Sequence, residues 1–211
     1  MLPAVLLAAG KSTRMGRSKA TLSVDAADTF LTRIVRTLEA AEVEDVVVVV
    51  GHEADAIVES VTSRGLSPRF VVNRDYETGQ LSSILAGLRA IDRPGVGGML
   101  LTLVDVPLVA VSTVRSVIAR YRATHAPIVR PVQRVRGAPG VETIRHGHPV
   151  IIDRRLFEAL RSANPATGAK PVVRAHVSGE GDVEVEDEGA FVDVDTPEDY
   201  LRFFNRSDAR R

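Results

Sequence analysis

The sequence predicts an α/β protein with a largely parallel sheet. Short apolar runs alternate along the chain with stretches whose apolar residues recur at helical spacing, and this alternation is typical of βαβ units. Val46–Val50 is an unbroken run of valines, which suits a strand that is buried on both faces. The chain has 211 residues, enough for one domain with a sizeable core.

Each strand predicted in the N-terminal half is followed by a predicted helix. The apolar runs predict strands at residues 5–8, 46–50, 69–72 and 99–104. Apolar residues at helical spacing predict helices at residues 30–41, 53–64, 82–91 and 111–122. We therefore expect the carboxyl ends of these strands to meet at one edge of the sheet, which is where open α/β sheets bind ligands.

The C-terminal half contains shorter elements of both kinds. Residues 128–131 are expected to be extended, residues 142–152 to form an inserted strand, and residues 154–161 to form a short helix. Two late strands, at residues 183–186 and 191–194, are expected before a C-terminal helix at residues 197–204. Because no repeat or linker divides the chain, we expect residues 1–205 to form a single domain and residues 206–211 a polar tail.

Composition excludes several classes of function. Lys plus Arg and Asp plus Glu number 27 each, so the chain lacks the basic surplus of nucleic-acid and membrane-surface binders. It contains no cysteine, which excludes disulfides, thiol nucleophiles and cysteine-ligated zinc. The apolar residues 2–9 are too few to span a bilayer and no basic segment precedes them, so a cytoplasmic protein is expected.

The loop after the first predicted strand combines small residues with cations. The strand ends in Ala8, Ala9 and Gly10, and four cations follow it: Lys11, Arg14, Arg17 and Lys19. Small residues let the backbone approach a planar base or a ribose, and Arg14 and Lys19 are spaced to reach successive phosphates. The loop is neither a P-loop nor the three-glycine dinucleotide fingerprint. The alternative is an ordinary βα loop with solvated cations.

Three aspartates are candidates for a metal site. Asp105 closes the strand predicted at residues 99–104, so its carboxylate belongs to the ligand edge of the sheet, either as a metal ligand or as a turn residue that caps the next helix. Asp193 and Asp195 are two apart on a stretch predicted to be extended, so both project from the same face. The residues from Thr196 onward form a good helix start, which leaves Asp193 and Asp195 unexplained.

Several motifs occur together in a fixed order. The first is Leu7-Ala8-Ala9-Gly10-x-Ser12-x-Arg14-Met15-Gly16-x-x-Lys19. The later ones are Asn73 with Gly79-Gln80-Leu81-Ser82-Ser83, then Asp105-Val106-Pro107-Leu108, Gly147-His148-Pro149-Val150 and residues 193–199. Together they resemble the signature of the MobA-like nucleotidyltransferases, and within these most closely the molybdenum cofactor cytidylyltransferases. The run Ala20-Thr21-Leu22-Ser23 departs from that family, which usually carries a leucine-rich, proline-containing run there.

The resemblance implies a fold and a set of site residues. The fold is the three-layer αβα, Rossmann-like nucleotidyltransferase fold of the GT-A-like type, with a mainly parallel mixed sheet. Arg14, Lys19 and Asp105 are the implied catalytic residues, and Asp105 and Asp195 the implied magnesium ligands, with Asp193 as a second candidate. The implied nucleotide-binding residues are Leu7, Ala8, Ala9, Gly10, Arg14, Lys19, Asn73, Gly79 and Ser83. Ser82 or Ser83 has the alternative role of a helix N-cap. His148 belongs to the acceptor side, or only to a structural turn.

The implied activity is transfer of a nucleoside monophosphate from a nucleoside triphosphate to a phosphorylated acceptor, with release of pyrophosphate and with Mg²⁺ as the cofactor. Ala9 stands where guanylyl-transferring relatives carry glycine, which favours CTP over GTP. The resemblance further implies the molybdenum cofactor (molybdopterin) as acceptor and a molybdoenzyme or its chaperone as partner, with no nucleic acid or membrane involved. The alternatives are a sugar phosphate or another phosphorylated acceptor, and a non-catalytic nucleotide-binding protein.

Overall fold

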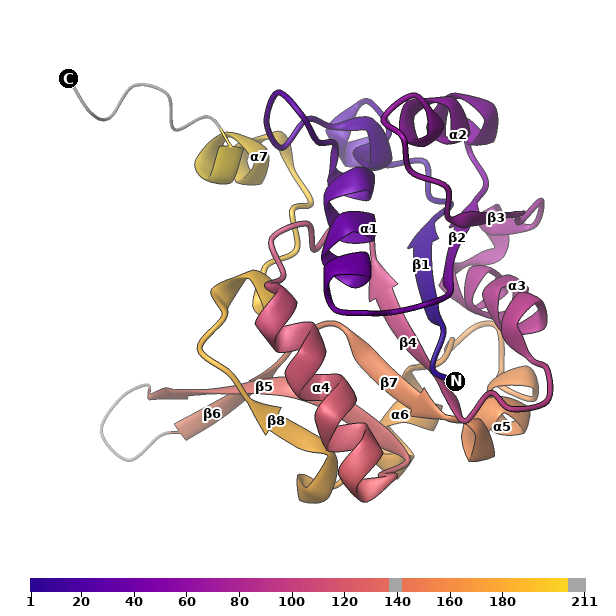
Figure 1. The fold of residues 1–211 in the computed structure, drawn as a ribbon, viewed down its shortest axis with the longest axis vertical. Helices are drawn as coiled ribbons and strands as arrows, with labels where there is room; N and C mark the ends of the chain where they lie inside the picture. Colours follow the sequence, from indigo (N-terminus) through magenta and orange to yellow (C-terminus); the bar gives the residue numbers. More distant parts are fainter. Residues whose placement is uncertain (137–141, 205–211) are drawn as a thin grey trace.

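A computed structural model describes residues 1–136 and 142–204. Its centre is a mixed sheet with the strand order β3-β2-β1-β4-β7-β5-β6, in which β8 pairs with β5 (Figure 1). The strands are β1 (Ala4–Ala8), β2 (Val46–Val50), β3 (Arg69–Val72), β4 (Gly98–Leu103), β5 (Ile128–Arg136), β6 (Glu142–His146), β7 (Val150–Asp153) and β8 (Asp182–Glu184). The α-helices are α1 (Phe30–Ala40), α2 (Ala54–Thr62), α3 (Gln80–Ile91), α4 (Val111–Thr124), α5 (Phe157–Arg161), α6 (Lys170–His176) and α7 (Pro197–Phe204).

The first four strands form the parallel part of the sheet. Strand β1 lies between β2 and β4, so that Leu6 pairs with Val48 on one side and with Thr102 on the other. Strand β3 continues the parallel order beyond β2, whereas β7 runs antiparallel to β4 and starts the mixed part. The prediction of a mainly parallel mixed sheet is confirmed. The carboxyl ends of β1 to β4 consequently lie at one edge.

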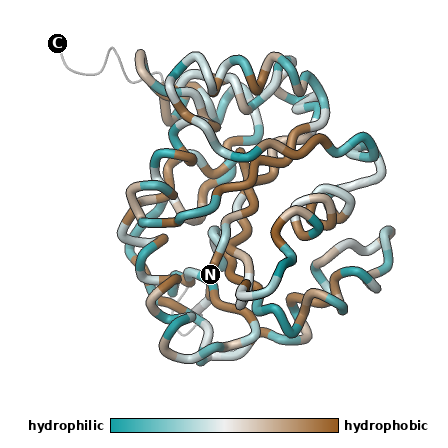
Figure 2. Tube along the Cα trace, turned by 45° about the vertical axis from the view of Figure 1, so that its right-hand side comes forward, coloured by the Kyte–Doolittle hydropathy of each residue, from teal (hydrophilic) through white to brown (hydrophobic). Residues whose placement is uncertain are grey.

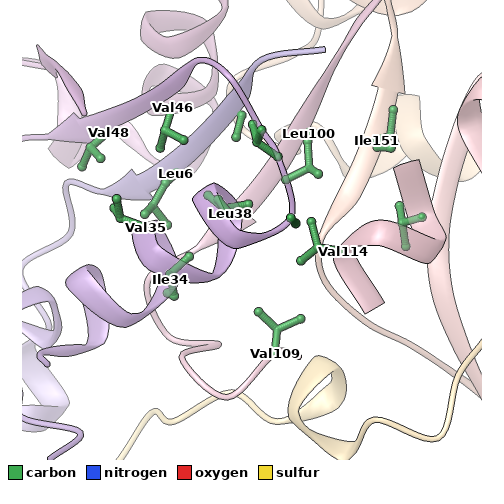
Figure 3. Packing of buried hydrophobic residues seen from close by; sticks show 14 of the residues in the cluster. Leu6, Ile34, Val35, Leu38, Val46, Val48, Leu100, Val109, Val114 and Ile151 are labelled. Carbon is green, nitrogen blue, oxygen red and sulfur yellow. The ribbon is translucent and has the colours of Figure 1, made fainter. Parts of the chain in front are cut away.

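Helices cover both faces of the sheet, and each face has its own apolar core. Figure 2 shows the most hydrophobic residues gathered along the central strands. Alternate residues of β1 and β2, such as Leu6 and Val48, pack against α1, α2 and α4 (Figure 3). Their neighbours, such as Val5 and Val49, pack against α3 and α5. Every residue of these strands is therefore buried, which explains the run of valines and confirms the αβα layers.

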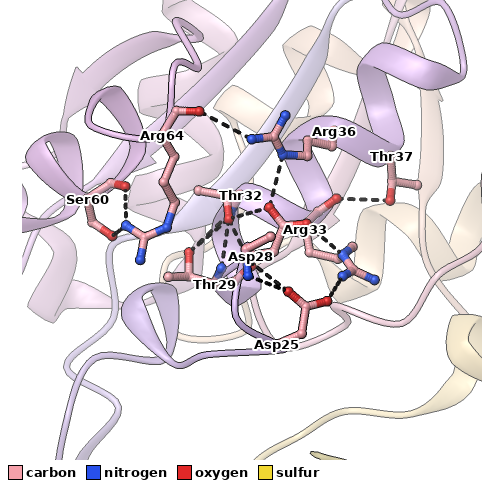
Figure 4. Close-up of polar contacts among 10 residues, drawn as sticks. Asp25, Asp28, Thr29, Thr32, Arg33, Arg36, Thr37, Ser60 and Arg64 are labelled. Carbon is pink, nitrogen blue, oxygen red and sulfur yellow. Dashed lines mark hydrogen bonds and ion pairs between the residues drawn. The ribbon is translucent and has the colours of Figure 1, made fainter.

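A buried carboxylate fixes the start of α1 (Figure 4). Thr29 is the N-cap, and its side chain and that of Thr32 each accept a hydrogen bond from the other residue's backbone N–H. Asp28 accepts hydrogen bonds from Thr32 Oγ1 at 3.1 Å and from Arg36 Nε at 3.0 Å. Arg36 in turn donates to the carbonyl of Arg64, just beyond the end of α2, at 3.2 Å. This network joins two helices on one face of the sheet.

The C-terminal helix packs against the loop that follows β1. The ring of Phe30 lies 6.0 Å from that of Tyr200 and 5.0 Å from that of Phe204, measured between centroids. Tyr200 also donates a hydrogen bond from its hydroxyl to the carbonyl of Ser23 at 2.9 Å. These side chains enclose a third apolar cluster that includes Met15. Helix α7 thereby holds the segment before it beside the loop.

Two predictions for the C-terminal half are wrong, and one helix there was not predicted. Residues 142–152 form two strands rather than one, because Pro149 has no N–H for a ladder and a Cβ on Gly147 would lie 2.2 Å from the carbonyl oxygen of Ala190. Residues 191–194 are not a strand, since residues 188–191 form a 3₁₀ turn and the N–H of Val194 bonds to the carbonyl of Asp105. Helix α6 was not expected, because it is short and has Pro171 in its first turn.

The remaining differences are small. The predicted ends of the other helices and strands lie within a few residues of the observed ones, except that β5 extends to Arg136 to pair with β6. The predicted polar tail, residues 206–211, lies outside the described residues. In the part of the chain that the structure describes, no helix is both long and apolar enough to cross a lipid bilayer.

Candidate functional site

A cleft of about 330 Å³ opens at the carboxyl edge of β1 and β4. Because the two strands are parallel neighbours, the loop after β1 and Asp105 after β4 come side by side. The expectation that the small-residue turn and Asp105 share one edge of the sheet is confirmed. All the predicted nucleotide-binding residues except Asn73 line this cleft, together with Asp105 and Asp195.

The loop after β1 is shaped by backbone turns. Ser12 and Gly16, with φ angles of 51° and 69°, lie on either side of a 3₁₀ turn at Thr13–Met15. Gly16 tolerates this left-handed conformation without strain. The hydroxyl of Ser12 accepts a hydrogen bond from the backbone N–H of Lys19 at 3.1 Å and so ties the two ends of the loop together. A Cβ on Gly10 would meet no atom within 4 Å, so the space above this residue is open to a ligand.

Lys19 lies between two carboxylates at the floor of the cleft. Its side chain is only 9% exposed, and its Nζ lies 3.5 Å from Asp105 Oδ2 and closer still to Asp195 Oδ1. Arg14 is 67% exposed and lies 2.9 Å from Asp195 Oδ2. The two other cations of the loop point elsewhere: Lys11 pairs with Glu77, and the Arg17 guanidinium lies over the ring of Tyr200. Of the four cations in this loop, only Arg14 and Lys19 therefore line the cleft.

The three candidate carboxylates have different surroundings. Asp105 Oδ1 is buried and has no hydrogen-bond partner among the described residues. A hydrogen bond from Lys19, supported by the charges of Lys19 and Arg14, holds the pKa of Asp195 below its usual range. Burial, and then the charge of Asp105, raises the pKa of Asp193. Within residues 1–136 and 142–204, no three His, Cys, Asp or Glu side chains are grouped as a metal site, so the candidate ligands are the pair Asp105 and Asp195.

Asn73 lies beneath the cleft rather than in its wall. The residue is 4% exposed, and its side-chain amide donates to the hydroxyls of Ser82 at 2.9 Å and Ser83 at 3.0 Å. The alternative that one of these serines caps α3 is wrong. The N-cap is Gly79, which has a φ of 118°, and no side chain caps the helix. Asn73 therefore positions Ser83, and only Ser83 reaches the cleft.

His148 lies in a turn between β6 and β7 and faces a second cavity, of about 440 Å³. Its Nδ1 is buried and has no partner among the described residues. Burial lowers the pKa of this histidine, against the opposing charges of Asp105 and Asp193. The segment around His148 forms a turn, and the role of this residue on the acceptor side stays a prediction. His148 forms part of the second cavity and does not line the first.

Tyr76 and Gln80 line the cleft but were not predicted. The ring of Tyr76 packs over Gly51, where a Cβ would lie 2.8 Å from the ring and 2.9 Å from the carbonyl oxygen of Ala9. Gln80 begins α3 and lines both cavities. Neither residue type carries a distinctive signal in a single sequence. The one available indication is position: Gln80 lies within the motif that begins at Gly79, and Tyr76 lies three residues before that motif.

Comparisons with known proteins identify relatives over nearly the whole chain. A family model described as the MobA-like NTP transferase domain matches residues 4–180, a segment that includes Asp105 and ends before Asp195. Nicotine blue oxidoreductase of Paenarthrobacter nicotinovorans is 32% identical over 200 residues, 94% of either chain. Purine catabolism protein PucB of Bacillus subtilis is 28% identical over 93% of this chain and 92% of that protein. The crystal structure of Rv0371c of Mycobacterium tuberculosis complexed with manganese has a TM-score of 0.72 and 26% identity, over 97% of this chain and 98% of that one.

Proposed function

Because the chain belongs to the MobA-like NTP transferase family, we propose that it transfers a nucleoside monophosphate from CTP to a phosphorylated acceptor and releases pyrophosphate. The observation that carries the proposal is the grouping of Arg14 and Lys19 with Asp105 and Asp195 in a single cleft. Two cations suit the phosphates of a triphosphate, and two carboxylates suit a divalent ion. Binding alone would need fewer of these charged groups.

Asp105 and Asp195 are suited to hold Mg²⁺. This ion is typically bound by one or two carboxylates together with substrate phosphates, and Asp105 Oδ1 is a buried acceptor without a protein partner. The manganese complex of the relative Rv0371c supports a divalent ion in this family. When bound, the ion would neutralise part of the negative charge of the triphosphate and would align its phosphates.

The transfer needs no general base. An acceptor phosphate is already ionised at neutral pH, so one of its oxygens attacks the α-phosphorus directly. The bond from that phosphorus to the oxygen that bridges to the β-phosphate breaks, and the electron pair leaves with pyrophosphate. Lys19 and Arg14 now pair with carboxylates, and we infer that they turn to the triphosphate and balance the charge on the leaving group.

CTP is proposed over GTP because of Ala9. This residue is buried and lines the cleft beside Gly10. If the base packs against this turn, the methyl group occupies space that a purine needs and a pyrimidine does not. The expected discrimination is about 1–3 kcal/mol, the usual effect of one methyl-sized difference in a pocket.

For the acceptor we propose the molybdenum cofactor, on the resemblance of the motifs. A molybdoenzyme or its chaperone would then receive the product. A sugar phosphate or another phosphorylated acid would use the same loop and carboxylates, so these acceptors belong in the assay. A reaction that consumes a nucleoside triphosphate also favours the cytoplasm as its location.

A second candidate function comes from the name of one relative, an oxidoreductase that is 32% identical to this chain. A redox reaction in this cleft would use Arg14 and Lys19 to hold the pyrophosphate of a dinucleotide. It would leave the pair Asp105 and Asp195 without a role. We therefore favour nucleotidyl transfer.

A pyrophosphate-release assay separates the candidates. Purified protein is incubated with Mg²⁺, each of CTP, GTP, ATP and UTP, and either molybdenum cofactor or a panel of phosphomonoesters. Acceptor-dependent pyrophosphate release that is fastest with CTP and absent in Asp105→Asn is the expected result. Oxidation of NADH or NADPH without any pyrophosphate release would instead establish the redox alternative.

A further inference from the structure

The second cavity, of about 440 Å³, adjoins the nucleotide cleft. Gln80 and Leu103 line both spaces, so they form the boundary between them. Leu103 is two residues from Asp105, the candidate metal ligand. A molecule held in the second cavity would therefore have one end at the boundary, next to the site where the triphosphate is cleaved.

The interior of this cavity is apolar. Its walls include Ile84 from α3, Leu101 from β4, Ile152 from β7 and Val173 from α6. Three of these elements belong to the core on that face of the sheet, so the surface is rigid as well as apolar. Such a surface suits the flat or apolar body of a small molecule.

Part of the cavity's lining is cationic. Arg130, Lys170 and Arg174 belong to it, and no Asp or Glu of the described residues does. Arg130 is neutralised by Asp182, at 2.9 Å. Lys170 and Arg174 are exposed, lie four residues apart on α6, and have no ion pair among the described residues. Two uncompensated cations therefore face an apolar space.

We propose that the second cavity binds the acceptor through an anionic group distinct from the phosphate that reacts. The reacting phosphate belongs at the boundary formed by Gln80 and Leu103, next to the cleft that Lys19 lines. Lys170 and Arg174 line only the second cavity, so they are assigned the second anionic group. The acceptor class is thus an apolar or planar body that carries a second anionic group besides the reacting phosphate. This inference rests on the proposed transferase function.

Binding of synthetic probes tests the assignment. The probes are 4-carboxyphenyl phosphate and 6-carboxy-2-naphthyl phosphate, which have two anionic ends at different spacings, and phenyl and 2-naphthyl phosphate, which have one. Dissociation constants are measured by calorimetry for the wild type, for the double variant Lys170→Ala/Arg174→Ala, and for Arg122→Ala as a control. Arg122 is an exposed cation on α4 that does not line this cavity.

The wild type should bind at least one carboxylated probe about tenfold more tightly than its parent, because charge-assisted contacts are the strong ones. The double variant should lose that preference and still bind the parent phosphates, and Arg122→Ala should match the wild type. A wild type that does not distinguish the probes, or binds none of them, overturns the proposal. A preference for the carboxylated probe that survives in the double variant also overturns the proposal.

Pyrophosphate release with the same probes separates this inference from the transferase function. If pyrophosphate is released and the KM for the carboxylated probe is the same in the wild type and the double variant, the transferase function stands. The proposed role of Lys170 and Arg174 is then refuted. Binding that depends on Lys170 and Arg174, without pyrophosphate release from any triphosphate with these probes or with the acceptors of the assay above, refutes the transferase and leaves an anion-binding cavity. A rise in KM for the carboxylated probe with an unchanged KM for CTP supports both.

Discussion

Lys19 and Asp195 are 176 residues apart in the sequence and form an ion pair at the floor of the cleft. The lysine also reaches Asp105, so its ammonium group stands between the two carboxylates that are suited to hold a divalent ion. On the proposed function, a metal ion and the lysine would therefore compete for these two carboxylates. The triphosphate would relieve this competition, because its phosphates would offer the lysine another partner.

We predict that this competition makes metal binding depend on nucleotide. Lys19→Gln should bind Mn²⁺ more tightly than the wild type when no nucleotide is present, because the carboxylates lose their internal cation. Paramagnetic resonance titration of free Mn²⁺ measures this directly. In the wild type, a non-hydrolysable CTP analogue should tighten Mn²⁺ binding, and the effect should shrink in the variant. Equal Mn²⁺ affinity of the two proteins without nucleotide would refute the competition.

The same substitution should slow the reaction. Loss of one fixed cation that faces a developing negative charge costs on the order of 100-fold in rate. Arg14→Gln should have a smaller effect, since Arg14 is largely exposed and solvent screens its charge. The kcat values of both variants, measured by pyrophosphate release, test whether Lys19→Gln is slower than Arg14→Gln. Circular dichroism is the folding control. A wild-type rate in Lys19→Gln would return this lysine to the role of a structural cation.

Asp105→Asn and Asp195→Asn should each abolish turnover without unfolding the protein. Both residues follow strand or loop ends rather than lying in the apolar core, so little packing is lost. Asp193→Asn should retain activity, because Asp193 does not line the cleft. Activity assays at a range of Mg²⁺ concentrations compare the three variants. Normal turnover in Asp105→Asn or Asp195→Asn would remove that residue from the metal site.

The buried Asp28 should make stability depend on pH. Burial alone would raise the pKa of this carboxyl, but hydrogen bonds from Arg36, Arg33 and Thr32 outweigh it and lower the pKa below the ordinary 3.8. A lowered pKa in the folded state means that the stabilisation is present above about pH 4 and is lost as the pH falls further. Asp28→Asn should therefore destabilise the protein at pH 7 by about 1–3 kcal/mol.

Urea unfolding at pH 7 and at pH 3 measures this effect. The difference in unfolding free energy between wild type and Asp28→Asn should be clearly smaller at pH 3 than at pH 7. An equal difference at both values would show that the carboxylate charge contributes nothing and that only the shape of the side chain matters. Asp25→Asn, at the exposed end of the same network, serves as a control that should change stability little.

Helix α3 approaches β1 closely at Gly87. A Cβ at this position would lie 2.3 Å from Cγ1 of Val5, which is fully buried and has no room to move away. Gly87→Ala should therefore destabilise the protein by about 1–3 kcal/mol, although alanine favours helices. The double variant with Val5→Ala should recover part of that loss relative to Val5→Ala alone. Thermal unfolding of the four proteins measures the coupling, and additive effects would contradict the close contact.

The N-terminal half of the fold was predictable because each element carries a strong local pattern. Strand β2 is entirely valine and α1 places Leu31, Ile34, Val35 and Leu38 on one face, so period and composition agree. In the C-terminal half, tertiary contacts override the local sequence pattern. Val194 lies in an apolar stretch that reads as a strand, but its N–H bonds to the carbonyl of Asp105 instead of to a neighbouring strand.

The site was predictable where parallel strands bring their carboxyl ends to one edge of the sheet. Asp105 and the Gly10 loop follow adjacent parallel strands, so their proximity follows from the topology. The second cavity was not predictable, since Lys170 and Arg174 come from a short helix with a proline in its first turn. Nor does any sequence pattern indicate that Asn73 would lie beneath Ser83 rather than in the cleft.

Transfer of a radioactive label from CTP to the acceptor tests the central claim most directly. The protein is incubated with Mg²⁺, an acceptor that supports pyrophosphate release, and CTP labelled with ³²P at either the α- or the γ-phosphorus. The proposed reaction places the α label in a product that also contains the acceptor, and the γ label in pyrophosphate. Both transfers should disappear in Asp105→Asn. A γ label that appears in the acceptor or in inorganic phosphate, with no α label in the acceptor product, would show a different reaction and contradict nucleotidyl transfer.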